Sequence, residues 1–90
     1  MKYKSHLTFG KRLRKARKEA NMTQDDLAGA ISNMIDQKRI SRTCVTQWES
    51  GNSVGIEGSS LIKVAKILNV TPEWLIFGIL RIWIKLLKTR

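Results

Sequence analysis

The sequence has few of the residues that break helices, form disulfide bonds or bind metal ions. Proline, cysteine and histidine each occur once, as Pro72, Cys44 and His6. A single cysteine forms no internal disulfide, and one cysteine with one histidine is too few for a zinc site. We therefore expect no metal ion and a reducing, cytoplasmic compartment.

Long apolar runs are also lacking. The N-terminal residues do not have the apolar run of a signal peptide. The most apolar stretch, 74–87, is interrupted by Gly78, Arg81 and Lys85, and it is shorter than the roughly 20 apolar residues that cross a bilayer. We expect no membrane span.

Patterns typical of catalysis are absent as well. We find no paired carboxylates in the pattern of a shared cleft, no spaced nucleophile and base, and no glycine motif that cradles phosphate. The sequence therefore predicts neither an enzyme nor a bound cofactor.

Acidic residues are scarce beside basic ones. The 90 residues include 17 Lys and Arg against 7 Asp and Glu, a formal net charge of +10, and 42% are hydrophobic. That apolar content is ordinary for a globular chain, so the charge does not indicate a disordered tail. A compact basic domain suggests a polyanionic partner: DNA, RNA or an anionic membrane surface.

The apolar residues recur at helical spacing nearly throughout, which predicts an all-α fold. Thr8, Thr23, Ser41 and Thr71 are placed to cap helices. Gly51 ends the third helix and is free to take a positive φ. The expected helices span 8–20, 23 to about 37, 42–49, a fourth that Ser59-Ser60 opens and Asn69 closes, and 73–77.

Three blocks of residues occur in the order found in one family. They are Met22-Thr23-Gln24-Asp25-Asp26-Leu27-Ala28, then Ile40-Ser41-Arg42 with Val45, Trp48, Glu49 and Gly51, then Leu61, Val64, Ala65, Leu68, Val70, Pro72, Trp74, Leu75 and Gly78. Over about 9–78 the chain resembles the phage-repressor helix-turn-helix proteins of Cro/CI or XRE type. The resemblance implies a compact, lambda-repressor-like five-helix bundle that binds operator DNA as a homodimer, with the helix 42–49 in the major groove.

The resemblance also implies roles for individual residues. The residues expected to contact bases are Arg42, Thr43 and Gln47, and those expected to contact the DNA backbone are Gln24, Ser41, Thr46 and Asn52. Lys38 and Arg39 lie on a segment where the chain departs from the family, and we expect them to add backbone contacts. Arg17 and Glu49 match a structural ion pair that fixes the recognition helix. The basic residues of the first helix, including Lys11, Arg12, Lys15 and Lys18, are interpreted as its solvated side.

The chain departs from the family pattern in three places. The segment 32–40 is longer than the usual turn before the recognition helix, and it either lengthens the second helix or forms a loop. The loop 51–58 is long and lacks basic residues. Residues 79–90 have no counterpart in the family's DNA-binding domain. We expect 1–78 to be that domain with a short basic N-terminal arm, and 79–90 to be an added amphipathic helix.

This terminal helix cannot stand alone in water, because its basic residues form one narrow stripe. We expect it to mediate dimerisation through Ile79, Ile82, Trp83 and Leu86. Membrane-surface binding and packing on its own domain are the alternatives.

The leading functional prediction is a sequence-specific regulator of transcription, of phage or prophage type, that binds double-stranded DNA in the cytoplasm. Two alternatives remain open: an antitoxin with the same fold and a toxin partner, and a basic protein that binds membrane surfaces. The operator sequence and the choice between repression and activation are not readable from the residues.

Overall fold

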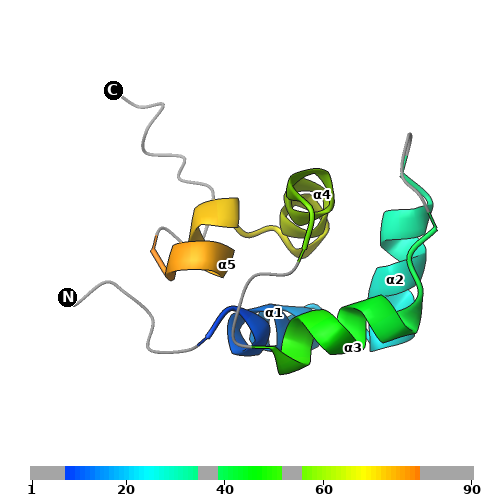
Figure 1. The fold of residues 1–90 in the computed structure, drawn as a ribbon, viewed down its shortest axis with the longest axis horizontal. Coiled ribbons are helices and arrows are strands. Elements are labelled where there is room, and N and C mark those ends of the chain that lie inside the picture. The colour runs from blue at the N-terminus through cyan, green and yellow to red at the C-terminus, as the bar shows by residue number, and fades with distance from the viewer. Residues whose placement is uncertain (1–7, 35–38, 52–55, 80–90) are drawn as a thin grey trace.

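The chain folds into helices without strands in the part that the structure describes. This computed structural model describes residues 8–34, 39–51 and 56–79. Its elements are α1 (Phe9–Glu19), α2 (Gln24–Ser32), α3 (Arg42–Ser50), α4 (Gly58–Leu68) and α5 (Pro72–Phe77) (Figure 1). The prediction of an all-α, five-helix bundle is confirmed for the described residues.

One apolar core holds these helices together. α1 packs against α3 and α5, α2 packs against α3 and α4, and α4 packs against α5. The fully buried residues at the centre of the core are Leu13, Leu27, Ile31, Val45, Val64 and Leu75. Each such side chain contributes about 1.5–3 kcal/mol relative to an exposed one, so every helix is fixed mainly by packing.

Side-chain caps set where four of the helices begin. The hydroxyls of Thr8, Thr23, Ser41 and Thr71 each accept a hydrogen bond from the backbone N–H three residues later. These contacts satisfy N–H groups that a helix leaves unpaired in its first turn. α4 differs from the prediction: it begins at Gly58, before Ser59 and Ser60, and its N-cap Glu57 makes no side-chain cap.

α2 ends at Ser32, which corrects the expectation of a helix reaching about 37. The Ser32 hydroxyl accepts from the N–H of Ile40 at 2.7 Å and lies 3.2 Å from the Ile40 carbonyl oxygen. Hydrogen bonds between a serine hydroxyl and the backbone of a later residue compete with continuation of the helix. Met34 continues the apolar spacing of α2 but lies in a turn after the helix. There it is half-buried, and its N–H donates to the Ile31 carbonyl.

Three of the chain's reversals use left-handed backbone. Asn21 and Asn69 have φ of 59°, and Gly78 at the end of α5 has φ of 79°. These residue types adopt that conformation at low cost. Gly51 instead has φ of −89° and ψ of 154°, so α3 passes directly into extended chain and the expected positive φ is wrong.

α1 approaches the backbone at the end of α3 closely at Gly10. A Cβ placed on Gly10 would lie 2.8 Å from the Trp48 carbonyl oxygen and closer still to that of Glu49. The absence of a side chain therefore sets how near the end of α3 lies to α1.

Among the described residues, no helix is both long and apolar enough to cross a bilayer. The same residues contain no cluster of three or more His, Cys, Asp or Glu side chains that could hold a metal ion. Residues 80–90 lie outside the described part, and with them the expected terminal helix beyond Ile79.

Candidate nucleic-acid interface

α3 presents one polar side outward and one apolar side to the core. Val45 is fully buried and Trp48 packs partly buried against the core, whereas Arg42, Thr43 and Gln47 are exposed. In the described part of the chain, the side chains of these three exposed residues make no hydrogen bond or ion pair. They are free to engage an external ligand.

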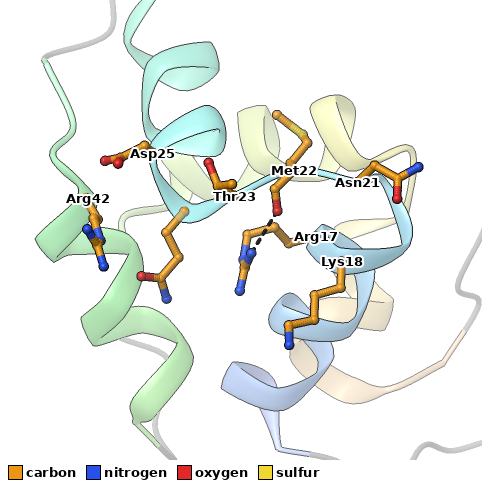
Figure 2. A pocket seen from close by; sticks show the side chains of 8 residues that line it. Arg17, Lys18, Asn21, Met22, Thr23, Asp25 and Arg42 are labelled. Atoms are coloured by element: carbon orange, nitrogen blue, oxygen red, sulfur yellow. Dashed lines mark hydrogen bonds between the residues drawn. The ribbon is translucent and has the colours of Figure 1, made fainter.

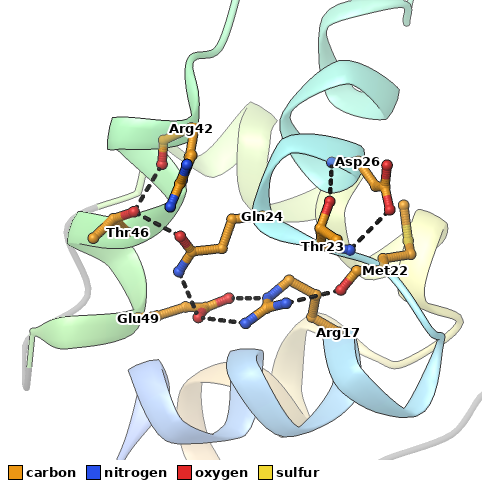
Figure 3. A network of polar contacts seen from close by, with 8 residues as sticks. All are labelled: Arg17, Met22, Thr23, Gln24, Asp26, Arg42, Thr46 and Glu49. Carbon is orange, nitrogen blue, oxygen red and sulfur yellow. Dashed lines mark hydrogen bonds and ion pairs between the residues drawn. The ribbon is translucent and has the colours of Figure 1, made fainter.

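A hydrogen-bonded network fixes the C-terminal half of α3 (Figure 3). Arg17 on α1 donates to both carboxylate oxygens of Glu49, at 2.6 Å and 3.1 Å. A third guanidinium N–H donates to the Met22 carbonyl at 2.8 Å. Because both charged side chains are at most 9% exposed, this bidentate contact is well shielded from solvent.

Gln24 joins the first turn of α2 to the same network. Its Nε2 donates to Glu49 at 3.1 Å, and its Oε1 accepts from the Thr46 hydroxyl at 2.8 Å. The Thr46 hydroxyl also lies 3.1 Å from the Arg42 carbonyl oxygen. Side-chain hydrogen bonds around the amide group of Gln24 thus link α1, α2 and α3.

Two adjoining surface hollows lie over this network, and we refer to them together as the basic hollow. Both are lined by Arg17, Lys18 and Gln24. The first continues to Asn21, Met22, Thr23, Asp25 and Arg42 (Figure 2), and the second to Arg14, Thr46, Glu49 and Ser50. Since Arg17 is paired with Glu49, the cations that line the hollow without an ion-pair partner among the described residues are Arg14, Lys18 and Arg42.

Arg14 was not among the residues assigned from the sequence, and Lys18 was interpreted only as part of a solvated helix face. Their spacing of four places both on one side of α1. Arg17 lies between them and points to α3, and this pattern could have indicated that the side faces α3.

Arg12 corrects the interpretation of the basic side of α1 more strongly. It is 5% exposed, and its guanidinium donates to the carbonyls of Leu75 at 2.9 Å and Ile76 at 2.7 Å. Desolvation by burial lowers the pKa of Arg12 from its ordinary value. The signal was available, because Arg12 follows Phe9 by three residues and precedes Ala16 by four, on the apolar face.

The remaining predicted residues are distributed as follows. Ser41 and Arg39 are exposed ahead of α3, and Ser41 caps that helix. Ile79 is 37% exposed after α5. The predicted residues that lie outside the described part are Lys38, Asn52, Ile82, Trp83 and Leu86.

The chain is similar to known helix-turn-helix proteins in sequence and in fold. A family model described as a helix-turn-helix domain matches residues 10–80. The chain is 38% identical over 73 residues to the HTH-type transcriptional regulator DicA of Escherichia coli (strain K12). The match covers 81% of this chain and 48% of DicA, so the chain spans about half the length of that relative.

The fold is similar to that of the P22 c2 repressor protein, crystallised in complex with synthetic operator 9T in the presence of Tl⁺. The TM-score is 0.65 at 24% sequence identity, and the match covers 78% of this chain and 94% of the repressor chain. At this identity the similarity concerns the fold.

Proposed function

The chain belongs to the helix-turn-helix domain family, and from this membership we propose that it is a transcriptional regulator that binds double-stranded DNA through α3. The resemblance to phage-repressor-like proteins that the sequence indicates is thereby confirmed. DicA is named as a transcriptional regulator, and the P22 c2 repressor was crystallised with operator DNA.

One observation carries the proposal. Arg42, Thr43 and Gln47 are exposed, and their side chains have no hydrogen-bond or ion-pair partner in the described part of the chain. The Arg17–Glu49 pair ties the helix that carries them to α1. Reading bases in the major groove needs polar side chains on a helix of fixed orientation. We assign Arg42 to a guanine edge, Gln47 to an adenine and Thr43 to a thymine methyl group.

The basic hollow would take the DNA backbone. Arg14 and Lys18 contribute unpaired charge, and the amide of Gln24 keeps one N–H that the network leaves unused. Ser41, Thr46 and Arg39 remain proposed backbone contacts, as do Lys38 and Asn52. The DNA would be bound by a homodimer, and the regulator would be of phage or prophage type.

Selection of bound duplexes from a random DNA pool, followed by titration of the selected duplex, tests the proposal. We expect Arg42→Ala to weaken binding about tenfold to a hundredfold and to relax preference at one base pair. Lys18→Ala should reduce the slope of log affinity against log salt concentration by about 0.9, because one phosphate contact is lost.

Lys66→Ala is the matched control for Lys18→Ala, since Lys66 is an exposed lysine on α4 that does not line the hollow. It should leave the salt slope nearly unchanged. Failure to enrich any sequence, together with an affinity independent of salt, would overturn the proposed function.

A further inference from the structure

Two acidic residues occupy the first turn of α2, and the fold accounts for only one of them. Asp26 accepts a hydrogen bond from the N–H of Thr23 at 2.9 Å, while the Thr23 hydroxyl accepts from the N–H of Asp26 at 3.0 Å. These reciprocal contacts form a capping box. In the described part of the chain, the exposed carboxylate of Asp25 makes no hydrogen bond and no ion pair.

Asp25 lies at a position where its negative charge disfavours binding of the DNA phosphate proposed for the basic hollow. It lines the basic hollow together with Lys18, Gln24 and Arg42 (Figure 2). Those three residues offer positive charge or N–H donors to a phosphate, whereas a carboxylate repels one. The favourable interaction of Asp25 with the positive end of α2 would be kept at any acidic first-turn position, so it does not explain why this one faces the hollow.

Asp25 and Arg42 reach the hollow from two different helices, each in the first turn. Neither side chain makes an ion pair among the described residues. A carboxylate and a guanidinium facing one hollow attract each other, and this attraction competes with any phosphate for Arg42.

We propose that Asp25 is a specificity-determining residue that disfavours binding to the DNA backbone alone. The proposal rests on the proposed function and assigns a source of specificity to the same surface. On DNA of arbitrary sequence, Asp25 repels the phosphate in the hollow and keeps Arg42 from joining the backbone contacts. On a duplex that contains the preferred sequence, Arg42 bonds a base edge, and this contact compensates for the lost attraction to Asp25. The only remaining cost of Asp25 is then its repulsion of the phosphate.

The test compares the full chain with its Asp25→Asn variant on two DNA duplexes of equal length, one selected from a random pool and one of scrambled sequence. Coulomb interaction across a solvated hollow predicts about threefold to fivefold tighter binding of the scrambled duplex by the variant. Binding of the selected duplex should tighten less, so the affinity ratio of selected to scrambled DNA should fall about twofold or more.

Glu73→Gln is the matched control. Glu73 is an exposed acidic residue in the first turn of α5 that does not line the hollow, and its substitution changes the net charge equally. It should leave the affinity ratio unchanged. Thermal unfolding of each variant confirms that differences in binding do not arise from loss of fold.

A double-mutant cycle with Arg42→Ala isolates the coupling. In the Arg42→Ala background, Asp25→Asn should produce a smaller gain on scrambled DNA than in the wild-type background, because no guanidinium is released. Equal gains in both backgrounds, or an unchanged affinity ratio in the single variant, would overturn the inference while wild-type DNA binding keeps the proposed function intact. Absence of wild-type binding to either duplex would overturn both.

Discussion

At the scale of single residues, an ion pair decides how α3 is held. Arg17 and Glu49 are 32 positions apart, and their contact connects α1 to the last turn of α3. Removing one partner of a shielded pair leaves a charge buried without compensation, which costs more than the pair itself contributes. The pair therefore acts chiefly by excluding other orientations of α3.

We expect Glu49→Ala to lower the free energy of unfolding by about 3 kcal/mol, because Arg17 and Gln24 both lose an acceptor. The double variant Arg17→Met, Glu49→Met should recover most of that loss. Urea denaturation measures both. Lys15→Ala, at the exposed Lys15–Glu19 pair, should change stability by less than about 1 kcal/mol. A similar small loss for Glu49→Ala would contradict this account.

Arg12 is the second residue with a specific structural role. Its guanidinium satisfies two carbonyls in the last turn of α5, where a helix leaves carbonyl groups unpaired and carries partial negative charge. We expect Arg12→Met to cost about 2–3 kcal/mol in urea denaturation, since a methionine fills the space without donating. Arg14→Met, on the exposed side of the same helix, should cost less than about 0.5 kcal/mol.

At the scale of secondary-structure elements, close helix packing depends on a missing side chain. Gly10 and Gly29 both lie within helices, but only Gly10 faces the backbone of a neighbouring helix. Gly10→Ala should destabilise the protein by about 1–3 kcal/mol, because α1 must move away from α3. Gly29→Ala meets nothing within 4 Å and should stabilise it by up to about 1 kcal/mol. Thermal melts of the two variants should shift in opposite directions.

The start of α2 predicts a pH dependence. Hydrogen bonds from Thr23 hold the pKa of Asp26 below its ordinary value. A carboxylate with a lowered pKa in the folded state adds stability above its unfolded pKa of about 3.9, and this stability is lost as the pH falls through the folded pKa. Wild-type protein should therefore be more stable than Asp26→Asn near pH 6, and the difference should shrink towards pH 2. A constant difference across this range in urea denaturation would contradict the assignment.

At the scale of the whole molecule, exposed apolar side chains bear on assembly. Among the described residues, Phe77 is 54% exposed and Ile79 is 37% exposed, at the point where the predicted terminal helix begins. Phe77 and Ile79 flank Gly78, and contact with another molecule would remove their apolar surface from water.

We expect the chain shortened to residues 1–78 to be monomeric under conditions where the full chain is dimeric, as measured by size-exclusion chromatography with light scattering. Trp83→Ser in the full chain should weaken the dimer in the same direction without removing the segment. A dimeric 1–78 fragment would show that 79–90 is not the dimer element.

Much of the fold was predictable, because its signals are local in sequence. Apolar spacing within each helix, a capping hydroxyl before four of them, and Asn21, Asn69 and Gly78 after three of them define the elements to within a few residues. The boundaries that failed have identifiable causes. The end of α2 depends on a hydrogen bond between Ser32 and Ile40, and the start of α4 has no side-chain cap to reveal it.

The sequence by itself determined the helical class, the family and the outward residues of α3, since each follows from spacing within one element or from ordered motifs. Spacing within α1 places Arg12 on the apolar face and Arg14 and Lys18 on one side of the helix. Only the tertiary structure decided that Arg12 donates to carbonyls of α5, that Arg14 and Lys18 line hollows shared with α2 and α3, and that Asp25 shares a hollow with Arg42. The contacts of Arg12 span 63 and 64 positions. No pattern within one helix encodes such distances, because they depend on how close packing of the core brings separate elements together.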